Sequence, residues 1–167
     1  MTASGFALKC NGAEDCTRKL RALADLSGII AENCAGPIQQ TMRNSAVANL
    51  DGSDAVDTGA LRASVEVENP SNSIVEHGDG KVSIGIRIDV SYALYIEYGT
   101  GPLGDPAVPH TEKMAWVYPT GRLDASGKPE FKTAHSQPAR PFMRPALYDN
   151  GPAFEKHIRD GIKGAFE

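Results

Sequence analysis

The side chain with the clearest chemical potential is a carboxylate, Glu97, which lies within five residues of three tyrosines: Tyr92, Tyr95 and Tyr98. A carboxylic acid in a pocket can act as a general acid, so a small hydrolase that uses Glu97 is one interpretation. The alternative is structural. The carboxylate would then pair with Arg140 or Arg144, or accept hydrogen bonds from backbone amides. No second catalytic group stands at a suitable spacing, which favours the structural interpretation.

Other catalytic and ligand-binding patterns are incomplete. The histidines lie in separate segments, and only His110, near Glu112, has a second metal ligand close by in sequence. The segment 121–128 resembles a phosphate loop, but five residues separate Gly121 from Gly127, and Pro129 stands where that loop needs a serine or threonine. Neither a nucleophile elbow nor a dinucleotide fingerprint is present. We therefore expect no catalytic residues, no metal and no cofactor.

Composition narrows the class of protein. The chain has 167 residues, a net charge of −4 and a sequence pI of about 5.6. A protein that holds nucleic acid through its phosphates needs a basic face, so this class is disfavoured. The three cysteines are odd in number and fit no zinc or redox spacing, so reduced thiols are expected. We find no membrane span and no signal-peptide pattern, and expect a single domain over residues 13–167 after a flexible segment, 1–12.

Hydrophobic periodicity predicts an α+β fold. Apolar residues recur at helical spacing from Glu14 to about Asn49, with a kink or restart expected at Gly36–Pro37. Alternation predicts a half-buried strand over 61–67 and a second strand over 82–90. These strands should form a small antiparallel sheet covered by the N-terminal helix. A helix is predicted from Phe142 to the end, bent near Gly151–Pro152.

Two segments stand out between these elements. Residues 92–98 carry apolar and tyrosine side chains three and four apart, which predicts one or two turns of helix closed by Gly99. Residues 113–118 and 131–134 read as the strands of a hairpin that projects from the body. Tyrosine and arginine commonly anchor interfaces, and prolines restrict the backbone that follows Arg140 and Arg144. The sequence thus predicts an interaction corner.

Three stretches resemble, in order, the tail-completion family of lambda-like long-tailed bacteriophages, also described as neck or head–tail joining proteins. They are Asp-Thr-Gly-Ala-Leu-Arg-Ala-Ser at 57–64, Tyr-Ala-Leu-Tyr-Ile-Glu-Tyr-Gly-Thr-Gly at 92–101 and Gln-Pro-Ala-Arg-Pro-Phe-Met-Arg-Pro-Ala-Leu at 137–147. With the elements between them, they extend the resemblance over about residues 15–165. The motif positions of the first stretch are Thr58, Gly59, Leu61 and Arg62.

The resemblance implies a structural virion protein of the neck or tail, assembled in the host cytoplasm, with neither catalysis nor cofactor. It implies a ring of copies, most simply a hexamer, that contacts the head connector or stopper proteins on one side and the tail terminator or tail tube protein on the other. DNA would cross the ring without specific binding, and no membrane is involved. A tail-terminator or head-closure role is the nearest alternative. The expected subunit or partner interface comprises Tyr92, Tyr95, Glu97, Tyr98, Gly99, Thr100, Arg140, Phe142 and Arg144.

Overall fold

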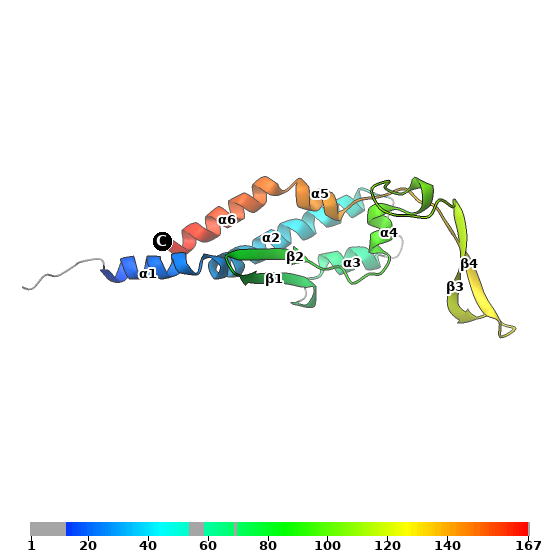
Figure 1. Cartoon of the computed structure of the whole chain (residues 1–167), viewed down its shortest axis with the longest axis horizontal. Coiled ribbons are helices and arrows are strands. Elements are labelled where there is room, and N and C mark those ends of the chain that lie inside the picture. The colour runs from blue at the N-terminus through cyan, green and yellow to red at the C-terminus, as the bar shows by residue number, and fades with distance from the viewer. Residues whose placement is uncertain (1–12, 54–58, 69, 167) are drawn as a thin grey trace, which may run out of the picture.

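The computed structural model describes residues 13–53, 59–68 and 70–166. The thiol of Cys10, the flexible segment predicted at 1–12 and the motif residue Thr58 therefore lie outside the described residues. Figure 1 shows an elongated molecule in which helix α1 extends from one end of the body and a β-hairpin extends from the other. The expected α+β class is confirmed, because a long helix packs against one small antiparallel hairpin and a second antiparallel hairpin follows in the chain.

The body is built on one long helix, α2 (Leu26–Asp51), which follows α1 (Ala13–Ala24). The break between them falls at Asp25, whose carboxylate accepts a hydrogen bond from the Gly28 amide at 3.2 Å and so caps α2. Of the kink or restart predicted at Gly36–Pro37, the restart is wrong, since α2 runs through both residues. Packing of other elements along α2 offsets the one hydrogen bond that proline removes.

The segment predicted as a strand at 61–67 is a helix, α3 (Ala60–Glu66), so that prediction is wrong. Leu61 and Val65 are buried while Ala63 and Val67 are exposed, which is the i, i+4 pattern of a helix. Over seven residues, alternation and helical spacing overlap. The i, i+4 ion pair between Arg62 and Glu66 is available only to the helix.

The first hairpin pairs β1 (Ser73–Gly78) with β2 (Lys81–Ile86) antiparallel, after a short 3-10 turn, η1 (Pro70–Asn72). The strand predicted over 82–90 is thus partly right, but pairing ends at Ile86 and its partner is β1 rather than the segment 61–67. Two polar side chains of α2 hydrogen-bond to the hairpin and to α3. Gln39 donates to the carbonyl oxygens of both strands, and the buried guanidinium of Arg43 donates to carbonyl oxygens at the end of α3.

The C-terminal segment forms α5 (Met143–Tyr148) and α6 (Gly151–Phe166), so the expected interruption near Gly151 is confirmed. Helix α6 packs along α2 (Figure 1). None of the described helices is long and apolar enough to cross a membrane.

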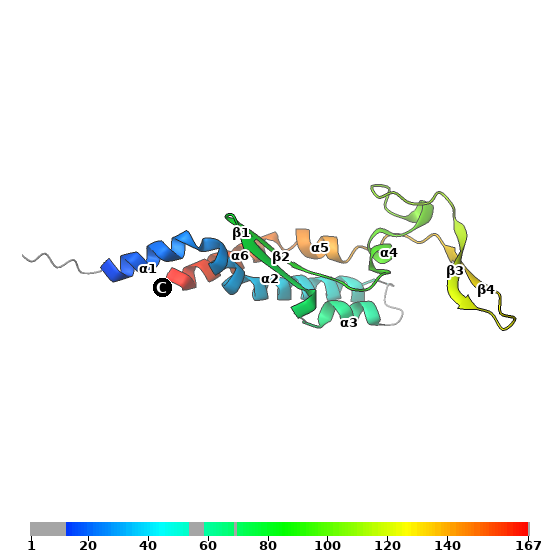
Figure 2. The same ribbon diagram turned by 60° about the horizontal axis from the view of Figure 1, so that its bottom comes forward.

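The second hairpin, β3 (Ala115–Leu123) with β4 (Pro129–His135), projects from the body in both views, as expected (Figure 2).

The crossing of α6 over α2 is close at Gly161, and this gives a first prediction. A Cβ at Gly161 would overlap Cys34 Sγ, and the Cys34 side chain is fully buried. Gly161→Ala should lower the free energy of unfolding by about 1–3 kcal/mol, the usual loss on overpacking. Gly164→Ala is the matched control on the same helix, because nothing lies within 4 Å of its new methyl group. The control should gain about 0.5–1 kcal/mol. Urea unfolding followed by circular dichroism measures both, and equal effects would contradict the close crossing.

Candidate interaction corner

The corner consists of residues 92–105 together with residues 136–144, which lie about forty residues further along the chain. Helix α4 (Ala93–Tyr98) forms its centre, and Gly99 ends that helix, as predicted. A 3-10 turn, η2 (Gly101–Leu103), follows. The two segments are joined by backbone hydrogen bonds: the amide of Thr100 donates to Gln137 O at 2.9 Å, and the amide of Gln137 donates to Thr100 O at 3.1 Å.

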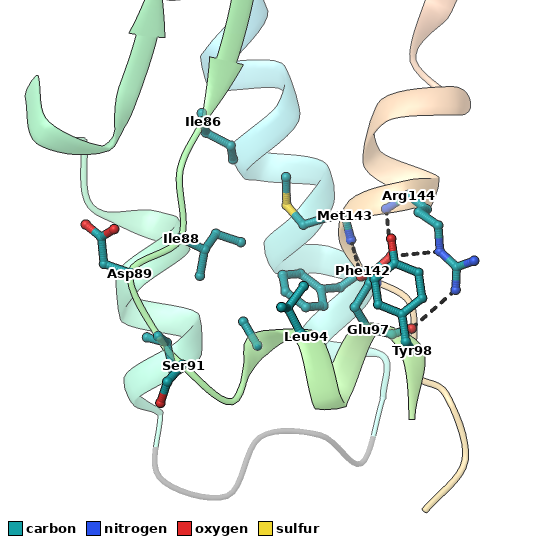
Figure 3. Close-up of a pocket in the computed structure, with 12 residues that line it drawn as sticks. Ile86, Ile88, Asp89, Ser91, Leu94, Glu97, Tyr98, Phe142, Met143 and Arg144 are labelled. Carbon is teal, nitrogen blue, oxygen red and sulfur yellow. Dashed lines mark hydrogen bonds and ion pairs between the residues drawn. The ribbon is translucent and has the colours of Figure 1, made fainter. Parts of the chain in front are cut away.

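The carboxylate of Glu97 holds the start of α5. Its side chain is 6% exposed, and it accepts hydrogen bonds from the amides of Phe142 (2.8 Å), Met143 (2.9 Å) and Arg144 (3.0 Å) (Figure 3). The first amides of a helix lack partners within the helix, and a negative charge there also interacts favourably with the helix dipole. Pro145 comes next and carries no N–H. Glu97 therefore caps α5, because its carboxylate accepts a hydrogen bond from every backbone N–H between residues 142 and 145.

Arg144 completes this arrangement from the same helix. Its Nε donates to Glu97 Oε1 at 3.1 Å, and its Nη1 donates to Asp105 Oδ2 at 2.6 Å. The guanidinium carbon lies 4.6 Å from the centre of the Tyr98 ring, a cation–π contact. Of the two arginines considered for pairing with Glu97, the structure thus selects Arg144.

Electrostatics at the corner follow from these contacts. The Ala107 amide, which donates to Asp105 at 2.9 Å, and then the Arg144 guanidinium hold the pKa of the Asp105 carboxyl below its ordinary value. Asp105 and then Glu97 raise the pKa of Arg144. Both groups are therefore charged at neutral pH, and the corner is closed by ionic hydrogen bonds, which are stronger than neutral ones.

Glycine is required at two places in the corner. Gly99 has φ 71° and ψ −171°, and a Cβ there would lie 2.6 Å from both Ala139 N and Gln137 O. Gly101 has φ 61°, and its Cβ would lie 2.7 Å from Ser136 Oγ. At Gly99 and Gly101 the backbone thus packs directly on residues 136–139, and a side chain at either position would clash with them.

The three motif stretches meet in one hydrophobic cluster. Leu61 comes from the first stretch, Ala93 comes from the second, and the third supplies two buried residues, Phe142 and Ala146; Val65, just after the first stretch, joins them. They pack with Ala46 and Leu50 of α2. Gly59 adopts φ 72° just before α3, and Arg62 pairs with Asp51 of α2 at 2.8 Å. The motif residues within the described chain therefore build the core and brace α3 against α2.

The predicted interface residues differ in accessibility. Glu97 and Phe142 are buried, while Tyr98, Gly99, Thr100, Arg140 and Arg144 are half-buried. The backbone amide of Arg140 donates to Ile96 O at 2.8 Å. Tyr92 and Tyr95 are 37% and 58% exposed, and line an aromatic pocket with Trp116 and Tyr118 of β3. Only this outer set can offer a large contact area to a partner.

A second, mostly apolar groove opens beside Glu97. Ile86, Ile88 and Leu94 face Met143 across it in Figure 3, while the carboxylate of Glu97 turns toward the amides of α5. The oxygens of Glu97 already accept four hydrogen bonds. This arrangement suits a carboxylate that holds structure, and it leaves the general-acid interpretation without support. No group of three or more metal-binding side chains is found in the described part of the chain.

Three polar residues that hold the fold were missed in the sequence: Gln39, Arg43 and Asp105. Gln39 and Arg43 lie four apart on the buried face of α2, in register with Met42, Ala46 and Leu50. A charged residue on an otherwise apolar stripe was the available signal for Arg43. Asp105 gave no comparable signal, because its partner Arg144 lies in a distant part of the chain.

Comparison with known proteins identifies a family. Residues 16–99 match the family described as "Bacteriophage HK97-gp10, putative tail-component". The match spans half of the chain, from α1 to the end of α4, and includes the first motif stretch and residues 92–99 of the second. The chain belongs to this family and is a structural component of a bacteriophage tail. Searches of curated proteins and of solved structures give no significant match.

Proposed function

We propose that this tail component is a tail-completion protein, which forms a ring at the head–tail junction and joins the head connector to the tail tube around the DNA channel. The observation that carries the proposal is the corner: the second and third stretches with the pattern of tail-completion proteins fold together there, and the described part of the first packs in the same hydrophobic cluster. Its outer side presents Tyr92 and Tyr95 beside the aromatic residues of β3.

A ring subunit needs two different surfaces, since each copy contacts the next after a fixed rotation. The exposed tyrosines of the corner are proposed as one such surface, with Glu97, Gly99 and Phe142 supporting it from inside. Tyrosine is among the side chains that contribute most to binding energy at interfaces. A ring of six copies would match a six-fold tail. Its net negative charge suits a channel through which DNA must slide without being held.

Two other positions in the same region are possible in this family: the tail terminator, which closes the tail tube, and the head-closure protein. Both would use ring surfaces of the same kind. They differ from tail completion in the particle that accumulates when the protein is missing, so particle morphology separates the three.

The deciding experiment is electron microscopy of particles made after deletion of the gene from its phage or prophage, with the wild-type gene supplied in trans as the control. DNA-filled heads beside separate tails of normal length are expected. Tails of abnormal length would instead assign the tail-terminator role, and heads that lose their DNA would assign head closure. Joined, infectious virions would overturn all three.

A further inference from the structure

The projecting hairpin β3–β4 carries an apolar face that nothing in the described chain covers. The strand register places Val117 opposite Thr133 and Pro119 opposite Phe131 on the same face. Val117 is 64% exposed and Phe131 is 59% exposed. Here the residues Val117, Pro119 and Phe131 are called the hairpin face. A two-stranded hairpin is marginally stable in water by itself, so an exposed apolar face on one indicates a contact with a partner.

The body carries a complementary hollow, here called the α2 groove. Strand β2 and helix α6 lie on α2 but leave a groove between them, with Met42 on its floor and Ile84, Leu147, Phe154 and Ile158 among its walls. Every side chain that lines this groove is apolar. Leu147 is 45% exposed. An apolar side chain from a partner would fill this groove and remove its lining from water.

The two surfaces cannot meet within one chain. The hairpin leaves the body beyond α4 and points away from β2 and α6 in both views (Figures 1 and 2). Charge favours another copy as the partner. From 113 to 135 the basic residues Lys113, Arg122, Lys128 and Lys132 outnumber the acidic residues Asp124 and Glu130, although the whole chain carries −4. The hairpin is therefore attracted to the acidic remainder of a second copy.

We propose that the hairpin face of each copy docks into the α2 groove of the next copy. Since the two surfaces differ, the contact runs head to tail and closes into a ring after a fixed rotation. The inference rests on the proposed function for the ring, and it names one contact between copies that is separate from the tyrosine surface of the corner. Phe131, the largest side chain of the hairpin face, is the anchor, as aromatic residues commonly are at interfaces.

The test uses two variants of the full chain. Val117→Asp combined with Phe131→Asp removes the hairpin face, and Leu147→Asp places a charge in the α2 groove. Leu20→Asp is the matched control, because Leu20 is 61% exposed on α1 and belongs neither to the two surfaces nor to the corner. Sedimentation velocity over a concentration series should show association of the wild type and the control. Each test variant should associate about 30-fold more weakly or worse, the loss that follows removal of an anchor side chain.

Mixing the two variants gives the sharper result. One variant keeps an intact α2 groove and the other keeps an intact hairpin face, so an equimolar mixture should form dimers that grow no further. Association of the mixture no stronger than that of either variant alone would overturn the proposal.

A cross-link keeps the proposal testable even if Leu147→Asp fails to fold. In a chain with Cys10 and Cys16 changed to serine, Phe131→Cys and Leu147→Cys together should give a ladder of disulfide-linked oligomers under oxidation. Phe131→Cys with Leu20→Cys is the control. Equal yields would overturn the contact. A ladder from a protein whose deletion leaves virions joined would instead keep the contact and overturn the proposed function.

Discussion

Replacing Gly99 by alanine is expected to lower the free energy of unfolding by about 3–5 kcal/mol, as strain and overpacking add. At φ 71° and ψ −171° this residue occupies a backbone region that side chains disfavour. The new methyl group would also lie 2.6 Å from Ala139 N and Gln137 O, which are backbone atoms that cannot rotate away. Small domains are stable by only about 5–15 kcal/mol, so the loss is a large fraction of the total.

Gly121→Ala is the control that separates the cost of backbone strain from the cost of the steric clash. Gly121 has φ 75°, but nothing lies within 4 Å of a Cβ at this position in the β3–β4 hairpin. The control should lose only the cost of the left-handed backbone, about 1–2 kcal/mol. Urea unfolding followed by circular dichroism at helical wavelengths measures both variants. A loss at Gly99 no larger than that at Gly121 would mean that the two halves of the corner are not packed as closely as the structure has them.

The sequence predicted the corner better than it predicted the sheet. Spacing of three and four over residues 92–98, followed by Gly99, was sufficient for α4, because a short helix and its closing glycine are local features. Residues 61–67 are equally local, yet their alternation suggested a strand. What decides between the two structures is burial of Leu61 and Val65 against α2, a contact that sequence periodicity does not contain.

The sequence predicted the possible partners of Glu97, but it did not predict how they are arranged around the carboxylate. The sequence offered an ion pair or backbone amides as partners, and the structure has both, with Arg144 and with the start of α5. Arg144 rather than Arg140 pairs with Glu97 because of the path that the segment 136–144 takes past α4. That path is set by the bonds between Thr100 and Gln137 and by the lack of side chains at Gly99 and Gly101.

Removal of the Glu97 charge is the second large effect expected. Glu97→Gln keeps the size of the side chain but exchanges one acceptor oxygen for an NH2 group that must face backbone N–H donors. Hydrogen bonds to charged groups contribute about 1.5–3 kcal/mol, and a buried donor left without a partner costs about 1–3 kcal/mol. We expect a net loss of about 3 kcal/mol in the free energy of unfolding. Glu66→Gln removes an exposed carboxylate that also pairs with an arginine, and it should lose less than about 1 kcal/mol.

A double-mutant cycle then divides the role of Glu97 between the arginine and the amides. If the ion pair contributes, Arg144→Met should be less damaging in the Glu97→Gln background than in the wild type, since its charged partner is already gone. If the capping of α5 carries the whole effect, the two losses will add. In that case Arg144 would act through Asp105 and the Tyr98 ring instead, and Asp105→Asn should reproduce most of the loss seen for Arg144→Met. The cycle thus shows whether the corner is held by a charge pair or by a helix cap, and so which residues an interface on its outer side depends on.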